Sequence, residues 1–536
     1  MRRISQVLLA AVLAYFGVPN RAWSQQEQGE HPGEHPGQHQ EQKAKGEEPP
    51  NPNGCSAAAT EEKSSVTQHS IRLGGETIPY TATAGYILLK NDKGEPTGLM
   101  YSAAYTRSDV KDLSRRPISF LYNGGPGSAT LWLHMGAFGP RRVVTTGAPD
   151  FTPPAPFTLV DNTESLLDKT DLVFIDAMGT GYSHAVCKGQ PKDFYGIDED
   201  VDAFGQFIDT YISRNGRWNS PKFLIGESYG TFRSAALGNY LQEHYSMQLN
   251  GIVLISSVLD LSQITFGPGD DRPYIFYLPS YAAVAWYHKV LKDRPADLPG
   301  FIQQAREYAN GPYAAALAKG GTLGADEKAA VAEKLSSFTG LSKDYLMKAD
   351  LRVKLGQFMA ELERSEGKTV GRIDARFTGD TSDLLEEDAD FDPEGPAVGG
   401  AFTAMINQYN HNELKFGKDM VYHNSAEGAR GWNWKRQPRP GRGGFFPGAP
   451  NVEGDLAEAI VTNPNLHVQV ENGYFDMATP FFATEYTMDH LGLPANLQKN
   501  VHLDYYDAGH MMYLNTPDRV SLHNNIGRFI EANVRQ

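Results

Sequence analysis

The sequence has few cysteines, few basic residues and no long apolar run after its N-terminus. Two cysteines among 536 residues, Cys55 and Cys187, form at most one bridge, which excludes a fold held together by several disulfides. The 49 Lys and Arg against 64 Asp and Glu give a formal net charge of −15, which argues against a nucleic-acid-binding protein. No run in the body of the chain has the length of a membrane-spanning helix, so no membrane span is expected.

Apolar and aromatic residues, in contrast, are plentiful. Hydrophobic residues make up 40% of the chain, with 26 Phe, 26 Tyr and 6 Trp, which is enough material for a large core. This composition excludes disorder throughout the chain. The length corresponds to about three typical domains, or to one large α/β domain that carries an insertion.

Residues 1–24 have the pattern of a secretory signal peptide. Arg2 and Arg3 precede a short apolar run at 7–16, and Ala22-Trp23-Ser24 offers a cleavage site between small residues. The apolar run is well short of the ~20 residues that span a bilayer. We therefore expect export to the periplasm or the medium. In such an oxidising compartment a Cys55–Cys187 bridge is slightly favoured over two free thiols.

A low-complexity arm is predicted at residues 25–65. Its three histidines, His31, His35 and His39, could bind a metal ion weakly. The intervening Pro and Gly residues prevent a helix that would place them on one face, so a solvated, disordered arm is the favoured interpretation.

Strands and helices alternate in the body of the chain, which is typical of an open α/β sheet. Strand-like runs occur at 78–83, 85–89, 99–105, 118–122, 172–176, 223–225, 252–255, 467–470 and 501–506. The later runs are continuously apolar, as in parallel strands buried on both faces. Residues 262–452 contain no comparable run and have mostly helical spacing. They predict a helical cap or lid inserted between two parts of one core, 66–261 and 453–536.

Gly226-Glu227-Ser228-Tyr229-Gly230 fits the G-x-S-x-G motif of a nucleophile elbow. The motif is weak alone, but it lies between the strand ending at Ile225 and the helix beginning near Thr231. That strand–turn–helix setting is the one that an exposed nucleophilic serine requires. Small Gly226 and Gly230 would let the backbone turn sharply at Ser228.

A serine nucleophile needs a histidine base and a carboxylate that orients it. His510 follows the last strand and Asp476 follows the preceding one, in the chain order Ser, acid, His. Both fall on loops at strand ends, where active sites gather in such sheets. Three rival residues are less well placed. His467 and His502 lie inside predicted strands, and Asp260 ends the strand that follows the nucleophile helix.

Asn123-Gly124-Gly125-Pro126-Gly127-Ser128 directly follows another strand. The structural interpretation is a tight turn. The functional one is a loop whose N–H groups stabilise a developing oxyanion. We expect the N–H groups of Gly125 and Tyr229 to converge on a tetrahedral acyl intermediate.

These motifs, in this order and together with Asn472-Gly473-x-x-Asp476 and Gly509-His510-Met511, resemble the serine carboxypeptidase family. The resemblance extends over most of residues 80–530. It implies an α/β-hydrolase fold with a mostly parallel sheet, flanking helices and a large helical cap. It also implies the triad Ser228, Asp476 and His510, and substrate binding by Asn123, Gly124 and Glu227. Residues 176–183 resemble a pocket-lining loop of that family.

The sequence departs from the family pattern at one acidic position. The family usually has a second Glu two residues before Gly139-Pro140, where this chain has Ala137. Ser128 and Thr479 stand where eukaryotic members have free cysteines. Two carboxylates share a hydrogen bond only if one is protonated, so Glu227 needs a raised pKa to bind a peptide's terminal carboxylate. The loss of the second Glu leaves the strength and pH dependence of that recognition open.

Three functions follow from these residues. The leading one is a secreted serine carboxypeptidase that acts on peptides through an acyl-enzyme on Ser228. An esterase or acyltransferase of the same fold is the alternative, because ester cleavage needs no free carboxylate. A non-catalytic binding protein on this scaffold is disfavoured, since such proteins generally lack a triad member. No cofactor, metal site or nucleic-acid partner is expected, because the motifs for them are missing and serine chemistry needs none.

Overall fold

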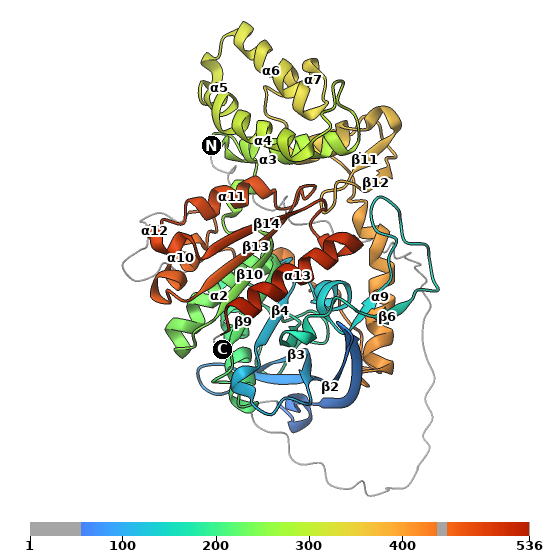
Figure 1. The fold of residues 1–536 in the computed structure, drawn as a ribbon, viewed down its shortest axis with the longest axis vertical. Helices are drawn as coiled ribbons and strands as arrows, with labels where there is room; N and C mark the ends of the chain where they lie inside the picture. The colour runs from blue at the N-terminus through green and yellow to red at the C-terminus, as the bar shows by residue number, and fades with distance from the viewer. Residues whose placement is uncertain (1–54, 437–447, 535–536) are drawn as a thin grey trace, which may run out of the picture.

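The computed structural model describes residues 55–436 and 448–534. Its centre is a ten-stranded sheet in the order β1-β2-β3-β7-β4-β9-β10-β13-β14, with the short β8 beside β3 (Figure 1). The first four strands in this order pair antiparallel. From β7 to β14 every pair is parallel. The predicted sheet is therefore present, with a long antiparallel extension at one edge.

The elements of the core have the following bounds. The strands of the sheet are β1 (Ser64–Leu73), β2 (Glu76–Lys90), β3 (Pro96–Arg107), β4 (Ile118–Tyr122), β7 (Asp171–Ile175), β8 (His184–Ala185), β9 (Lys222–Ser228), β10 (Gly251–Ser257), β13 (His467–Gly473) and β14 (Val501–Tyr506), and a separate pair is β5 (Arg141–Val143) with β6 (Leu159–Asp161). The helices are α1 (Ile197–Arg214), α2 (Tyr229–Tyr245), α10 (Glu453–Thr462), α11 (Phe481–Asp489), α12 (Ala495–Gln498) and α13 (Thr516–Ala532), with a π-helical turn η3 (Leu133–Phe138).

The parallel strands are buried on both faces. All residues of β4 and β10 are buried, as expected of apolar strands covered by helices on either side. Phe120 and Tyr122 face a hydrophobic cluster that contains residues of α1, α2 and α10. Leu121, which points the other way, belongs to a cluster with residues of η3 and α13. The sheet is thus the middle layer of three.

The N-terminal part of the described chain differs from the prediction. Residues 55–65 were expected to end a disordered arm, yet Ala57–Thr60 form a 3-10 helix and β1 begins at Ser64. β1 is polar on its exposed face, which masks it in the sequence, and it is held by ten paired residues of β2. The runs predicted at 78–83 and 85–89 are one strand, β2. The predicted signal peptide, most of the arm and its three histidines lie outside the described residues.

A disulfide joins Cys55 to Cys187, whose Cα atoms lie 4.9 Å apart. The bridge spans 132 residues of sequence and connects the segment before β1 to the loop after β8. Neither cysteine lies on the elbow or on the loops that carry the acid and the base. The bridge therefore anchors the start of the described chain to the core.

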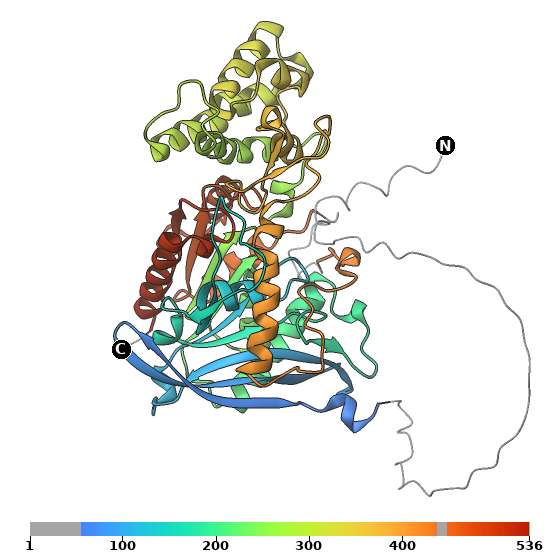
Figure 2. The same cartoon turned by 90° about the vertical axis from the view of Figure 1, so that its right-hand side faces the viewer.

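The predicted insertion at 262–452 splits into two parts. Its first part is a helical cap that stands at one end of the core (Figure 2), and its hydrophobic cluster also includes residues of α11 and of the loop before it. The cap elements are α3 (Arg272–Tyr287), α4 (Leu298–Tyr308), α5 (Ala314–Ala318), α6 (Ala325–Thr339), α7 (Lys343–Lys348), α8 (Leu355–Glu361), β11 (Lys368–Val370) and β12 (Thr378–Asp380). Within the residues described, no helix combines the length and apolarity needed to cross a bilayer.

The second part of the insertion belongs to the core, which corrects the predicted boundary of the cap. Helix α9 (Glu394–Asn412) packs Ala397, Ala401, Phe402 and Met405 into the cluster that contains η3 and α13. These residues recur at helical spacing and form one apolar face, which the core buries. The cap therefore ends before α9, and the chain returns to the sheet along that helix.

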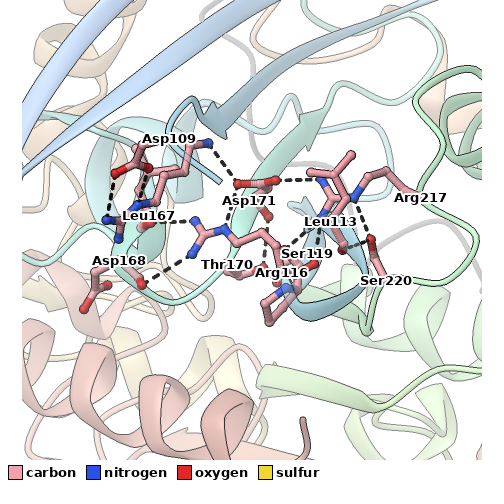
Figure 3. A network of polar contacts seen from close by, with 12 residues as sticks. Asp109, Leu113, Arg116, Ser119, Leu167, Asp168, Thr170, Asp171, Arg217 and Ser220 are labelled. Atoms are coloured by element: carbon pink, nitrogen blue, oxygen red, sulfur yellow. Dashed lines mark hydrogen bonds and ion pairs between the residues drawn. The ribbon is translucent and has the colours of Figure 1, made fainter. Parts of the chain in front are cut away.

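Buried ion pairs fasten the amino ends of three parallel strands (Figure 3). Asp171, the first residue of β7, accepts hydrogen bonds from Arg116 Nε at 3.0 Å and Arg217 Nη1 at 2.6 Å. Arg116 precedes β4 and Arg217 precedes β9. The Asp171 side chain is 1% exposed. One carboxylate therefore balances the charge of two buried guanidinium groups. These side chains lie at the end of the sheet opposite the carboxyl ends of its parallel strands.

Removing this carboxylate is expected to destabilise the protein strongly. Asp171→Asn leaves two buried arginines without their counter-charge, and we expect a loss of about 3–5 kcal/mol in the free energy of unfolding by urea. Asp109→Asn is the matched control, because Asp109 pairs with Arg107 at the surface and its side chain is 44% exposed. Its loss should stay below about 1 kcal/mol. Equal losses in the two variants would contradict this account of the network.

Candidate active site

Ser228 stands at the sharp turn between β9 and α2. Its backbone has φ 61° and ψ −130°, in the left-handed half of conformational space that side chains other than Gly rarely adopt. Gly226 is required there, because a Cβ on it would lie 2.2 Å from the Gly230 carbonyl oxygen. The strand and the helix hold the serine in a strained position, as a nucleophile elbow does.

The sheet order brings the acid and base loops to the same edge as Ser228. β9, β10, β13 and β14 are parallel neighbours, so their carboxyl ends meet. Ser228 pairs in register with Ser257 of β10. The adjacent Ser256 donates a hydrogen bond from its hydroxyl to the His510 carbonyl oxygen at 2.7 Å. This bond ties the histidine loop to the strand next to the nucleophile.

Asp476 and His510, the predicted acid and base, lie in contact. His510 Nδ1 lies 2.8 Å from Asp476 Oδ2, and both residues are buried. The other carboxylate oxygen accepts the N–H groups of Ala478 and Thr479 at 2.8 and 2.9 Å. The Thr479 hydroxyl donates to Oδ2 at 2.7 Å. The carboxylate is therefore held in one orientation, with its charge toward the imidazole.

Two opposing effects act on His510. Burial alone would lower its pKa, but the charge and hydrogen bond of Asp476 raise the pKa above the ordinary value for histidine. The Ser228 hydroxyl makes no hydrogen bond to His510 among the described residues. Such nucleophile–base bonds are often long until substrate binds. The structure thus pairs the predicted acid with the predicted base, and Ser228 lies at the end of β9, which β10 separates from β13.

Residues 372–376, at the end of the cap, bridge the acid and base loops. The bonds are Met477 N to Arg372 O (3.0 Å), Ala375 N to Phe475 O (3.1 Å), His510 N to Ile373 O (2.8 Å) and Arg376 Nη1 to Asp507 O (2.7 Å). A Cβ on Gly509 would lie 2.4 Å from the Asp374 Cβ, so the contact is close. The prediction missed this segment because it was assigned to a lid, and no local motif marks it.

The Gly-rich loop lies directly against the elbow. A Cβ on Gly124 would stand 2.4 Å from the Tyr229 nitrogen and 2.8 Å from the Glu227 carbonyl oxygen. Gly125 has φ 105°, a backbone conformation that favours glycine. Tyr229 is the first residue of α2, where N–H groups have no acceptor within the helix. The loop and the elbow are therefore adjacent, as two donors to one oxyanion must be.

Arg233 contacts and supports the Gly-rich loop. This role was not predicted from the sequence. Arg233 lies on α2, fully buried, and its Nη1 donates to the Asn123 carbonyl oxygen at 2.9 Å. Asp200 accepts from Arg233 Nε at 2.7 Å and balances its charge. The guanidinium also stacks over the Phe204 ring, 4.2 Å from its centroid. A lone Arg among the apolar residues of a predicted helix is the signal that could have found it.

Asn123 and Glu227 form a second polar pair beside the nucleophile. Asn123 Nδ2 donates to Glu227 Oε1 at 2.8 Å, and the Leu133 N–H holds the Asn123 oxygen at 3.0 Å. Glu227 Oε2 has no hydrogen-bond partner among the described residues. Burial raises the pKa of Glu227 to about 7, against the opposing charge of His510. A buried carboxyl with one free oxygen is thus available to a ligand.

The remaining predicted positions fall in different places. The rivals are excluded from the site, since His467 and His502 lie on β13 and β14 and Asp260 caps a 3-10 helix. Ala137 is fully buried in the apolar face of η3. Among the residues described, no group of His, Cys, Asp or Glu is arranged to hold a metal ion.

Part of the loop at 176–183 lines a pocket at the surface. Met178, Gly179 and Ser183 border a volume of about 220 Å³, and Tyr195 and His423 also line it. None of the predicted site residues lines this pocket, so the predicted role of the loop stays a prediction. The cavity is adjacent to the aromatic residues that pack on Tyr229, because Tyr195 stacks on Trp432 and Trp432 contacts the Tyr229 ring.

Comparisons with known proteins bear on the family and the fold. Residues 74–296 match the model of the family described as serine carboxypeptidase, a range that includes the Gly-rich loop and the elbow. The chain is similar to the solved structure of Kex1(delta)p, a prohormone-processing carboxypeptidase from Saccharomyces cerevisiae. The two chains are 14% identical, the match covers 84% of this chain and 91% of that chain, and the TM-score is 0.54. Proline iminopeptidase from Mycobacterium smegmatis matches with 14% identity, coverage of 84% and 98%, and a TM-score of 0.36. No curated protein sequence matches significantly. The predicted family resemblance and the α/β-hydrolase fold are confirmed.

The acid–base pair predicts a sharp loss of nucleophile reactivity in Asp476→Asn. An amide can no longer hold His510 in the required tautomer, and we expect the rate of Ser228 labelling by a fluorophosphonate to fall by about 10⁴-fold. Asp489→Asn, at the exposed end of α11, is the control and should label at the wild-type rate. Unchanged labelling of Asp476→Asn would reject Asp476 as the orienting acid.

Proposed function

We propose that this chain, a serine peptidase related to the serine carboxypeptidases, removes residues one at a time from the C-terminus of peptides. The observation that carries the proposal is the Asn123–Glu227 pair, buried next to the nucleophile with one carboxyl oxygen free. An enzyme that cleaves at chain ends must recognise a terminal carboxylate. Asn123, the protonated form of Glu227 and the N–H of Gly124 supply donors for it.

The proposed reaction has two halves. His510 takes the proton of the Ser228 hydroxyl, and Oγ attacks the scissile carbonyl carbon. The N–H groups of Gly125 and Tyr229 stabilise the resulting oxyanion. His510 then protonates the leaving amine, which frees the C-terminal residue and leaves the acyl-enzyme. Water, activated by the same histidine, hydrolyses the ester and restores Ser228.

We further propose that the enzyme acts outside the cytosol. The sequence of residues 1–24 supports export, and the Cys55–Cys187 bridge is of the kind that persists in oxidising compartments.

An esterase or acyltransferase remains the second candidate. It is favoured by one observation: the position of the family's second Glu is Ala137, buried in an apolar face where it offers nothing to a carboxylate. Cleavage of esters would need only the triad and the oxyanion donors.

A pair of substrates separates the two candidates. The wild-type protein should cleave an N-blocked dipeptide with a free C-terminus at least tenfold more efficiently than its C-terminal amide, measured as kcat/KM by amino-acid release. Ser228→Ala should lose about 10⁴-fold or more of this activity. Equal cleavage of acid and amide, with faster cleavage of an acyl ester, would favour the esterase.

The pH profile is the second prediction. Glu227 binds a carboxylate only when protonated, and its pKa is raised to about 7, so kcat/KM for the free acid should fall above pH ~7, approaching tenfold per pH unit. An acyl ester should lack this alkaline decline and keep only the acid limb, which reflects deprotonation of His510. Parallel profiles for the two substrates from pH 4.5 to 9 would contradict the role of Glu227.

A further inference from the structure

Glu394 is a second buried carboxyl near the site that no motif marks. It is the first residue of α9 and is 3% exposed. Its Oε1 has no hydrogen-bond partner among the described residues. Its N–H points to Asp392 Oδ1 at 3.4 Å, and Asp392 in turn accepts the N–H groups of Arg372 and Ile373. Because Ile373 accepts the His510 N–H, Glu394 is attached to the segment that holds the catalytic base.

Tyr513 lies close to both Glu394 and the Asn123–Glu227 pair. Its ring is fully buried, and its hydroxyl makes no well-aligned hydrogen bond among the residues described, although Glu227 and Asn123 lie close enough to bond to it. The charges of Glu227 and Glu394 both act on this hydroxyl, and Asn123 is close enough to influence it. Three buried polar atoms in one region therefore make no well-aligned hydrogen bond within the part of the protein described: Glu227 Oε2, Glu394 Oε1 and Tyr513 Oη.

The packing explains why this carboxyl comes from α9 instead of η3. A Cβ on Gly136 would lie 2.7 Å from the Tyr513 ring and 3.0 Å from Phe402 of α9. Ala137, the next residue of η3, is itself fully buried in the apolar cluster. A Glu at position 137 would have to bury its carboxyl among apolar side chains. Helix α9, which supplies Phe402, also carries Glu394 at its start.

We propose that Glu394 binds the C-terminal carboxylate of the peptide together with Asn123 and Glu227, with the Tyr513 hydroxyl as a further donor. This rests on the proposed carboxypeptidase function. Buried polar atoms without partners cost free energy, and a ligand that bonds to all three recovers it. A carboxylate has two acceptor oxygens and can accept these hydrogen bonds when both glutamates are protonated.

The charges around Glu394 favour its protonated form. Burial raises its pKa well above the ordinary value, and the carboxylates of Asp392 and Asp374 act in the same direction. Glu227 adds a further negative charge, and Arg372 is the opposing cation. A neutral carboxyl here donates to the substrate, whereas an ionised one repels it. The free-acid substrate should therefore bind best at acidic pH.

Two variants of Glu394 test this assignment by binding and pH dependence. At pH 5.5, Glu394→Ala should raise KM for the N-blocked dipeptide free acid about tenfold or more and leave kcat/KM for an acyl ester within about twofold. Glu394→Gln keeps a neutral donor, so it should bind the free acid nearly as well and lose part of the alkaline decline. Tyr513→Phe, which removes only the hydroxyl, should raise the same KM severalfold. Glu413→Gln, at the other end of α9 and paired with Arg141 near the surface, is the matched control.

The outcomes separate the two proposals. If the wild type does not prefer the free acid over the amide, the proposed function fails, and the assignment of Glu394 fails with it. If the wild type prefers the free acid but Glu394→Ala and Glu394→Gln have the same KM and pH profile as the wild type, only the assignment of Glu394 is wrong. The assignment of Glu394 would also be overturned if Glu394→Ala lost as much ester cleavage as cleavage of the free acid. A loss of cleavage confined to peptides that end in Lys or Arg would overturn it as well.

Discussion

The strained backbone of Ser228 is the constraint on which the rest of the site depends. A residue other than Gly in this conformation costs on the order of 1–3 kcal/mol, so the fold must hold it there. β10 pairs with β9 up to Ser228 on one side, and α2 begins at the next residue on the other. The same turn sets the Tyr229 N–H beside the Gly-rich loop and carries Glu227 into its buried position. One turn thus positions the proposed nucleophile, one of the two proposed oxyanion donors and the carboxyl group of Glu227.

The catalytic loops depend on a part of the chain that first looks peripheral. Residues 372–376 leave the cap and bond to the loops of Asp476 and His510, and Asp392 and Glu394 follow on the way back to the core. The end of the cap is therefore a support for the loops of Asp476 and His510. The proposed role of Glu394 would make this return path part of the carboxylate-binding site.

Much of the fold and the positions of the candidate site residues can be predicted from the sequence, because local patterns encode them. The apolar parallel strands, the G-x-S-x-G turn and the strand-end positions of Asp476 and His510 are readable at short range. β1 is not recognised in the sequence because its exposed face is polar. Its pairing with β2 depends on tertiary contacts that no local pattern encodes. Sequence patterns also fail to reveal Arg233, the 372–376 segment and Glu394. Each of them interacts with residues more than 80 positions away in the chain. The boundary of the cap was misplaced because helical spacing alone does not say which layer a helix joins.

The central claim is that a protonated, buried carboxyl pocket receives the peptide's terminal carboxylate. It is tested most directly by counting protons on binding. Ser228→Ala would be titrated calorimetrically with an N-blocked dipeptide free acid near pH 8, in buffers of different ionisation enthalpy. Glu227 is ionised at that pH in the free protein and must be protonated in the complex, so the account predicts uptake of about one proton per peptide bound. Binding without proton uptake would contradict it.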